Sequence, residues 1–70
     1  MDEIIFQVNQ DIDGGFTADC LTQAICTQAH NWEDLRRNVK KAVAAFYFGR
    51  ARRPERVRLH LVRDEVMVQP

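Results

Sequence analysis

A single amphipathic helix constrains this chain more than any other feature of its sequence. Apolar residues recur at the i, i+4, i+7, i+8, i+11 spacing that places them on one side of a helix: Leu35, Val39, Ala42, Val43 and Phe46. Asn31 is a good N-cap, and Asp34 stands three residues on, where its side chain can reach back to the cap amide. Gly49 is expected just after the last turn, and Pro54 rules out a continuation. The sequence therefore predicts one helix over residues 31–48, whose apolar stripe needs a sheet to cover it.

Four segments can supply this sheet, and in all but residues 25–28, which form a short candidate strand, apolar and polar residues alternate. They are residues 4–9, 16–21, 25–28 and 57–62. Between the first two, Asp13 and Gly14 supply the positive-φ residues that a tight hairpin turn requires. Residues 66–68 either extend the last strand or form a short fifth one. The apolar sides of the strands, that of the last strand included, should pack on the helix.

The predicted element order is β-β-β-α-β. One helix on one face of a small, mostly antiparallel sheet is an α+β architecture. Seventy residues allow one domain, 1–70, and no repeat or low-complexity segment divides it. A chain of this size buries only about 60% of its unfolded surface, so its core is marginal. We therefore expect self-association to add apolar burial.

The C-terminal end of the chain is where this self-association is expected. The run 57–68 is longer than a typical strand of about 5–6 residues, and its end has no obvious partner among the other strands. An unpaired strand edge invites a second copy. We predict a dimer or a dimer of dimers, with Val66, Met67 and Val68 at the contact and the 50–58 segment nearby.

Nothing in the sequence points to export or to a membrane. The N-terminus lacks the apolar run of a secretion signal, and no stretch approaches the ~20 apolar residues that cross a bilayer. The two cysteines, Cys20 and Cys26, allow at most one disulfide and are expected to stay reduced. These features favour a cytoplasmic protein.

Charge is balanced overall but divided along the chain. Residues 1–34 carry seven acidic residues and no Lys or Arg, whereas residues 35–70 carry all ten basic residues and three acidic ones. The two halves can neutralise each other on folding. Alternatively, they can form opposed surfaces that suit head-to-tail association or the steering of a charged partner.

The sequence contains no recognisable catalytic, metal or cofactor site. Residues 9–14 match the first half of a calcium loop, but Cys20 stands where the bidentate glutamate should be. Cys20 and Cys26 do not have the spacing of a zinc site. No nucleophile lies at readable spacing from a base, and no glycine loop could hold a phosphate. We therefore expect a protein that is not an enzyme and needs no cofactor.

One basic cluster could bind nucleic acid through its phosphates. It consists of Arg50, Arg52, Arg53, Arg56 and Arg58. Tyr47 and Phe48 precede it and could stack on bases. The sequence pI of about 6.7 is far below that of a typical nucleic-acid-binding domain. Nucleic-acid binding is therefore an alternative interpretation.

Several segments, in this order, resemble the HicB family of antitoxins, whose core is a partial ribonuclease-H-like β-β-β-α-β fold. They are the hairpin Asp11–Phe16, the pair Thr27-Gln28, the helix Trp32–Val43 and the run Arg58–Glu65. The chain departs from the family in having Ala29-His30-Asn31 where a Gly-Asp-Thr-like turn is usual. Larger members append a DNA-binding segment, for which these residues leave no room, so operator binding is not expected.

The resemblance implies a non-catalytic module that masks a small, basic ribonuclease toxin of the HicA type. Acidic residues of the first half would then face the toxin: Asp11, Asp13, Asp19, Glu33 and Asp34. Two other interpretations stay open. The chain could bind nucleic acid through its arginine cluster, or it could be an orphan scaffold domain whose partner is itself.

Overall fold

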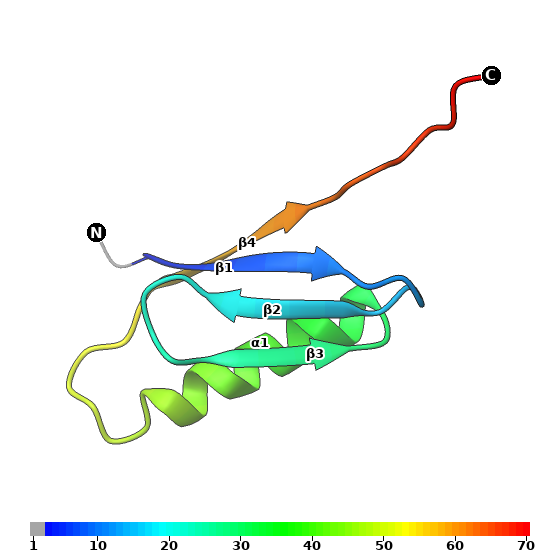
Figure 1. Ribbon diagram of the computed structural model, residues 1–70. Helices are drawn as coiled ribbons and strands as arrows, with labels where there is room; N and C mark the ends of the chain where they lie inside the picture. Colours follow the sequence, from blue (N-terminus) through cyan, green and yellow to red (C-terminus); the bar gives the residue numbers. More distant parts are fainter. Residues whose placement is uncertain (1–2) are drawn as a thin grey trace.

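The computed structural model describes residues 3–70. Its elements are β1 (Glu3–Gln10), β2 (Phe16–Cys20), β3 (Cys26–Ala29), α1 (Trp32–Phe46) and β4 (Arg56–Val62). The predicted β-β-β-α-β order and the α+β class are confirmed. Figure 1 shows the single helix lying across one face of the sheet.

The four strands form one mixed sheet in the order β3-β2-β1-β4. The β1–β2 and β2–β3 pairs are antiparallel hairpins, whereas β4 runs parallel to β1. The helix explains this change of direction. It carries the chain back to the end of the sheet where β1 begins, as a crossover connection between parallel strands does.

Five residues, 11–15, join β1 to β2, and the three between Asp11 and Gly15 form a tight turn. The carbonyl of Asp11 accepts from the Gly14 amide at 3.0 Å, and the Asp11 amide donates to the Gly15 carbonyl at 2.7 Å. Gly14 has a φ of +94°, which is the left-handed conformation that such hairpin loops place at their last residue. The prediction of positive φ was therefore right for Gly14 and wrong for Asp13, because this loop needs only one such residue.

The helix begins at the predicted cap. Asn31 Oδ1 accepts from the Asp34 amide at 2.8 Å, while the Asp34 carboxylate accepts from Asn31 Nδ2 at 3.2 Å. The Asp34 carboxylate thus binds the side-chain amide of Asn31, whereas the sequence predicted a bond to the backbone amide of the cap. The helix ends at Phe46, two residues earlier than predicted. Gly49, with a φ of +78°, lies in the turn that follows the C-cap Tyr47.

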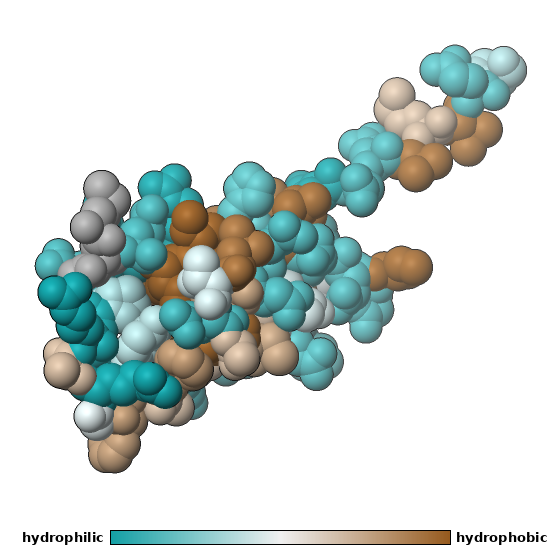
Figure 2. Space-filling view, turned by 60° about the vertical axis from the view of Figure 1, so that its left-hand side comes forward, coloured by the Kyte–Doolittle hydropathy of each residue, from teal (hydrophilic) through white to brown (hydrophobic). Residues whose placement is uncertain are grey.

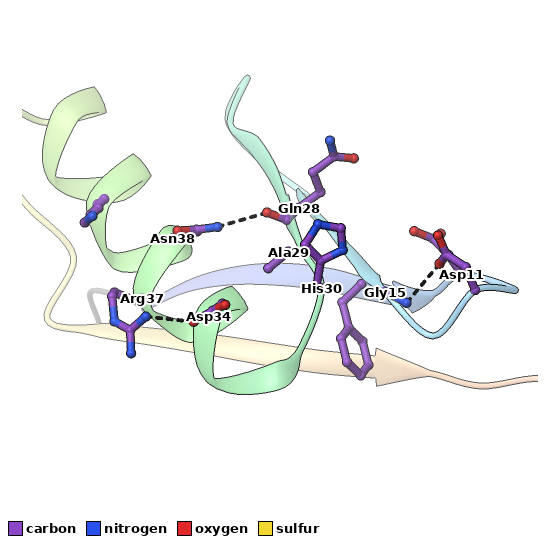
Figure 3. Close-up of a pocket in the computed structure, with 11 residues that line it drawn as sticks. Asp11, Gly15, Gln28, Ala29, His30, Asp34, Arg37 and Asn38 are labelled. Atoms are coloured by element: carbon purple, nitrogen blue, oxygen red, sulfur yellow. Dashed lines mark hydrogen bonds and ion pairs between the residues drawn. The ribbon is translucent and has the colours of Figure 1, made fainter.

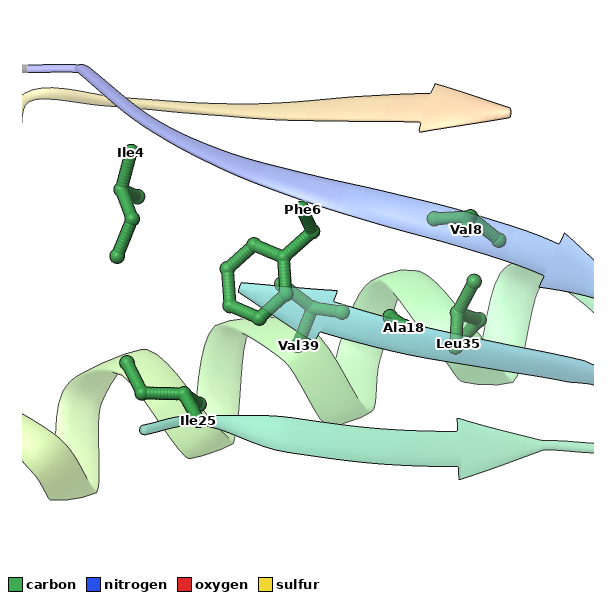
Figure 4. Close-up of a cluster of buried hydrophobic side chains, with 7 residues drawn as sticks. All are labelled: Ile4, Phe6, Val8, Ala18, Ile25, Leu35 and Val39. Carbon is green, nitrogen blue, oxygen red and sulfur yellow. The ribbon is translucent and has the colours of Figure 1, made fainter. Parts of the chain in front are cut away.

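Apolar side chains between α1 and the sheet make up the core (Figure 4). The buried ones are Ile4, Phe6, Val8, Ala18, Ile25, Leu35 and Val39. The helix lies over β2 and β3. Phe6 and Val8 reach into the core from β1 and are fully buried. Val43 and Phe46, which continue the helix stripe, are only partly buried at the edge of this core.

The prediction that β4 packs on the helix is wrong for most of the strand. In the register, Val57 and Leu61 lie beside the buried Ile4 and Val8 of β1, so they point to the helix side of the sheet. Yet these two side chains are 38% and 39% exposed. The helix covers β2 and β3, which leaves the helix side of β4 largely open, and only Leu59 is partly buried there.

The end of the chain does not pair with the sheet. Residues 63–70 are exposed and extend away from the sheet beyond β4, as Figure 1 shows. Residues 66–68 therefore neither extend β4 nor form a fifth strand, and the prediction that they do one or the other is wrong. No helix in the described residues 3–70 is long and apolar enough to cross a membrane.

Truncating Leu35 should destabilise the domain. The side chain is fully buried, so Leu35→Ala should lower the free energy of unfolding by about 2–5 kcal/mol. Phe48 is 86% exposed, and Phe48→Ala should change the same quantity by less than about 0.5 kcal/mol. Urea titration followed by the fluorescence of Trp32 measures both. Equal effects of the two substitutions would show that the core is placed incorrectly.

Candidate functional site

A polar pocket of about 580 Å³ lies at one end of the sheet. The β1–β2 loop, the end of β3 and the first turns of α1 meet there (Figure 3). Asp11 and Asp13 lie on one wall, and Asp34 lies on another. The structure thus brings together three of the five acidic residues that the sequence singled out.

Local hydrogen bonds hold the two loop carboxylates. Asp13 Oδ1 accepts from the Gly15 amide at 3.0 Å, and Asp11 Oδ2 accepts from Thr17 Oγ1 at 3.3 Å. Each carboxylate uses one oxygen in these bonds, and both residues are exposed. The loop therefore presents two fixed negative charges to solvent, each with an oxygen left to accept from a partner.

Gly15 allows the loop to approach β3 closely. This residue is buried, and a Cβ atom on it would lie 3.2 Å from the carbonyl oxygen of Ala29 and 3.3 Å from Asp13 Oδ1. Both distances are shorter than ordinary van der Waals contact. A larger residue would push the acidic loop away from the end of β3, so Gly15 helps to set the shape of the pocket.

The helix wall of the pocket carries both signs of charge. Asp34 Oδ1 accepts from Arg37 Nη1 at 2.7 Å, and Lys41 follows one turn later. Between them, Asn38 Nδ2 donates to the Gln28 carbonyl at 2.9 Å and ties the helix to β3. The pocket therefore has an acidic loop on one side and an Arg37–Lys41 wall on the other.

Arg37, Asn38 and Lys41 of this wall were not among the predicted site residues, although the sequence contains a signal for them. Asp34, Arg37, Asn38 and Lys41 follow the i, i+3, i+4, i+7 spacing of one helix face. The apolar stripe of the helix has the same period, and it predicts the residues of the core. A polar stripe beside it predicts which helix residues share a surface.

The other two acidic residues of the predicted set lie elsewhere. Asp19 is near the far end of β2, where it pairs in register with Gln7 and Cys26. These residues lie on the face of the sheet that α1 does not cover. Glu33 is exposed on α1, with Oε1 3.6 Å from Arg36 Nη1. The pocket contains neither of them.

The predicted arginine cluster is divided among three places. Arg50 lies over the Phe46 ring, 4.7 Å from its centroid, and donates to the Phe46 carbonyl at the end of α1. Arg52 and Arg53 line a smaller pocket of about 200 Å³. Arg56 and Arg58 lie on β4, and Arg58 Nη2 is 3.0 Å from Glu3 Oε2. The arginines of the cluster thus differ in their local partners.

Both expectations about charge are partly right. Each of the three ion pairs within residues 3–70 joins an acidic residue of the first half to an arginine of the second, so some charge is neutralised internally. The Asp11–Asp13 loop lies where β1 ends, whereas the connection 50–55 precedes β4 at the end where β1 begins. The acidic loop and the arginine-rich connection thus occupy opposite ends of the sheet.

No group of three or more His, Cys, Asp or Glu side chains within the described part of the chain is placed to hold a metal ion. No protein-family model matches the sequence, and no curated protein or solved structure matches it significantly. The geometry of the pocket and the charge of its walls therefore provide the basis for a functional proposal.

The N-cap should set both the stability of α1 and the position of Asp34. Asn31→Ala removes the acceptor for the Asp34 amide and should lower the free energy of unfolding by about 0.5–2 kcal/mol. Asn31→Ser keeps an oxygen acceptor at the cap and is the matched control, which should lose much less. Urea unfolding measures both variants. Equal losses would mean that the cap hydrogen bond does not stabilise the helix.

Proposed function

We propose that this chain is a non-catalytic protein–protein interaction module, similar to a HicB-type antitoxin, that binds and masks a small basic ribonuclease toxin of the HicA type. The observation that carries the proposal is the pair of fixed, exposed carboxylates of Asp11 and Asp13 at the rim of a pocket. Carboxylates in this state can accept charge-assisted hydrogen bonds from lysine or arginine side chains of a partner.

The rigidity of the acidic loop supports this role. Two backbone hydrogen bonds close the loop, and side-chain bonds to Gly15 and Thr17 orient its carboxylates. A partner that binds here loses little affinity to the ordering of these groups, because they are already ordered. The negative charge would also increase the rate at which a basic partner associates.

The opposite wall of the pocket would add specificity. Arg37 and Lys41 can pair with an acidic residue of the partner, next to the site where the loop pairs with a basic one. A partner surface with both signs in the matching order would fit, whereas a uniformly basic surface would meet repulsion from the helix wall. The pocket is therefore better suited to a folded protein than to a polycation.

The fold and the thiols are compatible with the proposal. The β-β-β-α-β order is the one that the resemblance implies. Cys20 and Cys26 are free thiols. Their register places them on opposite faces of the sheet, because Cys20 pairs with Phe6 and Cys26 pairs with Asp19. We propose a cytoplasmic location, where a toxin that cleaves cellular RNA would act.

Nucleic-acid binding has less support from the geometry. Arg50 is bound to the end of α1 and Arg58 to Glu3, which leaves Arg52, Arg53 and Arg56 outside the ion pairs within residues 3–70. Three arginines around one connection can attract phosphate in a salt-dependent way. Binding of this kind would be detected as salt-sensitive association of the protein with the RNA substrate of the toxin.

Removing the loop charges should weaken toxin inhibition. RNA cleavage by a purified HicA-type toxin, assayed with increasing amounts of this protein, should be inhibited by the parent chain. Asp11→Asn combined with Asp13→Asn keeps the size of both side chains and should weaken inhibition on the order of tenfold at low salt. Asp19→Asn removes a carboxylate outside the pocket and should leave inhibition unchanged.

Two results would contradict the proposed function. One is equal inhibition by the loop variant and the Asp19→Asn control. The other is salt-sensitive binding of the protein to the RNA substrate itself, abolished by Arg52→Ala with Arg53→Ala, because the protein would then protect RNA without touching the toxin.

The protein alone should leave RNA intact. Incubation of the pure chain with RNA and Mg²⁺ or Mn²⁺ should give no cleavage products, since the described residues contain no group of carboxylates placed to hold such an ion. Gel analysis of the RNA over several hours is a sufficient measurement. Cleavage that disappears in Asp11→Ala or Asp13→Ala would instead identify the loop as part of a catalytic site.

A further inference from the structure

The most exposed large apolar side chain of the described residues 3–70 is that of Ile12, at the tip of the β1–β2 loop. Its relative exposure is 108%, and it is neither part of the core nor packed against it. Figure 1 shows the loop at the end of the sheet toward which the C-terminal segment points, and Figure 2 shows an apolar projection of the body at that end. The whole side chain is therefore accessible to a partner.

The turn that contains Ile12 does not require an apolar residue there. Its backbone hydrogen bonds join Asp11 to Gly14 and Gly15, and its side-chain hydrogen bonds use the carboxylates of Asp11 and Asp13. Ile12 takes part in none of these bonds. Turns usually contain Gly, Pro, Asn, Asp or Ser, each of which favours the turn conformation for its own physical reason. The local structure thus gives no reason for an isoleucine at this position.

The loop lies between two hollows. In the order β3-β2-β1-β4 it joins the two middle strands. The polar pocket lies on the β3 side of the loop, and a second hollow of about 510 Å³ lies on the β4 side, where Val62 and Arg63 line it. Asp11 lines both hollows, and Ile12 lines the second. The loop is therefore a ridge with an apolar tip between two concave surfaces.

Negative charges flank the apolar tip. Asp11 and Asp13 stand on either side of Ile12 in the chain, and hydrogen bonds from Thr17 and Gly15 hold their carboxylates. At protein interfaces, the side chains that contribute most to affinity are buried in pockets of the partner and surrounded by contacts that exclude water. The tip of this loop is thus complementary to an apolar socket with lysine or arginine side chains at its rim.

We propose that Ile12 is the apolar anchor through which this protein binds its toxin, with the β1–β2 loop inserted as a ridge into a cleft of the toxin. Ile12 fills an apolar socket in this cleft, while basic side chains at the rim pair with Asp11 and Asp13. The walls of the cleft enter the hollows on both sides of the loop. The anchor rests on the proposed function and adds to it a contact whose contribution to affinity does not depend on charge.

Truncation of the anchor should weaken toxin binding. Calorimetric titration of a purified HicA-type toxin into this protein measures the Kd, and Ile12→Ala should raise it about tenfold or more. Ile12→Leu keeps an apolar side chain of the same size and should retain most of the affinity. Circular dichroism should show both variants folded, because Ile12 does not pack against the core.

Phe48→Ala is the matched control. Phe48 is 86% exposed and lines neither hollow. It follows α1 at the other end of the sheet from the loop (Figure 1). Its truncation removes more apolar surface than Ile12→Ala does and should leave the Kd unchanged.

The salt dependence of binding separates the anchor from the charges. Salt screens interactions between exposed charges but does not weaken an apolar contact in the same way. The affinity lost in the double variant Asp11→Asn with Asp13→Asn should therefore shrink as the salt concentration rises. The affinity lost in Ile12→Ala should stay the same from low to moderate salt.

Nuclear magnetic resonance of the ¹⁵N-labelled protein locates the contact. Addition of the toxin should shift the amide signals of residues 9–14 and 62–64, which include the loop tip and the lining of the second hollow. The signals of residues 48–51, at the other end of the sheet, should not move. Shifts confined to the lining of the polar pocket would contradict the insertion of the loop as a ridge.

The outcomes separate the anchor from the proposed function. Binding that is equally tight in the parent and in Ile12→Ala would overturn the anchor and leave the proposed function intact. A loss that disappears at moderate salt, or one that Phe48→Ala shares, would also overturn the anchor alone. A parent chain that does not bind the toxin would contradict the proposed function, and the anchor with it.

Discussion

Burial of one side of α1 against the sheet is the interaction on which the rest of this structure depends. Leu35 and Val39 from the helix and Phe6 and Val8 from β1 are the largest fully buried side chains (Figure 4). Burial of each such side chain stabilises the folded state by about 1.5–3 kcal/mol. The described residues contain one helix, which covers β2 and β3 and leaves β4 half outside the core. The position of the core thus determines where apolar side chains of the sheet stay exposed.

The same docking of the helix assembles the polar pocket. The start of α1 reaches the end of β3 and lies beside the β1–β2 loop, and the bond from Asn38 to the Gln28 carbonyl fixes this approach. Residues that lie far apart in the sequence, such as Asp11 and Lys41, therefore face one pocket. The proposed partner site and the uncovered helix side of β4 both follow from the position of the helix, since the helix that forms one wall of the pocket does not reach over β4.

Local chemistry made much of the fold predictable. The Asn31 cap, the period of the apolar stripe and the glycine of the first turn are short-range signals, and each element appears within a few residues of its predicted place. The candidate site was only partly predictable. Asp11, Asp13 and Asp34 meet, but Asp19 lies on the other face because side chains alternate along β2, and Glu33 points to solvent from the helix.

Short-range signals in the sequence specify which segments become strands and helix, because hydrogen bonding at turns and caps and the period of apolar residues act over only a few residues. Tertiary packing, in contrast, sets which strands the helix covers, which charges share a surface and which partners the arginines contact. Arg50 folds back on Phe46 while Arg58 reaches Glu3, although both belong to one basic run. These outcomes depend on the direction of the crossover and on the fact that one helix is too narrow to cover all four strands. Both are properties of the packed molecule, which no local pattern encodes.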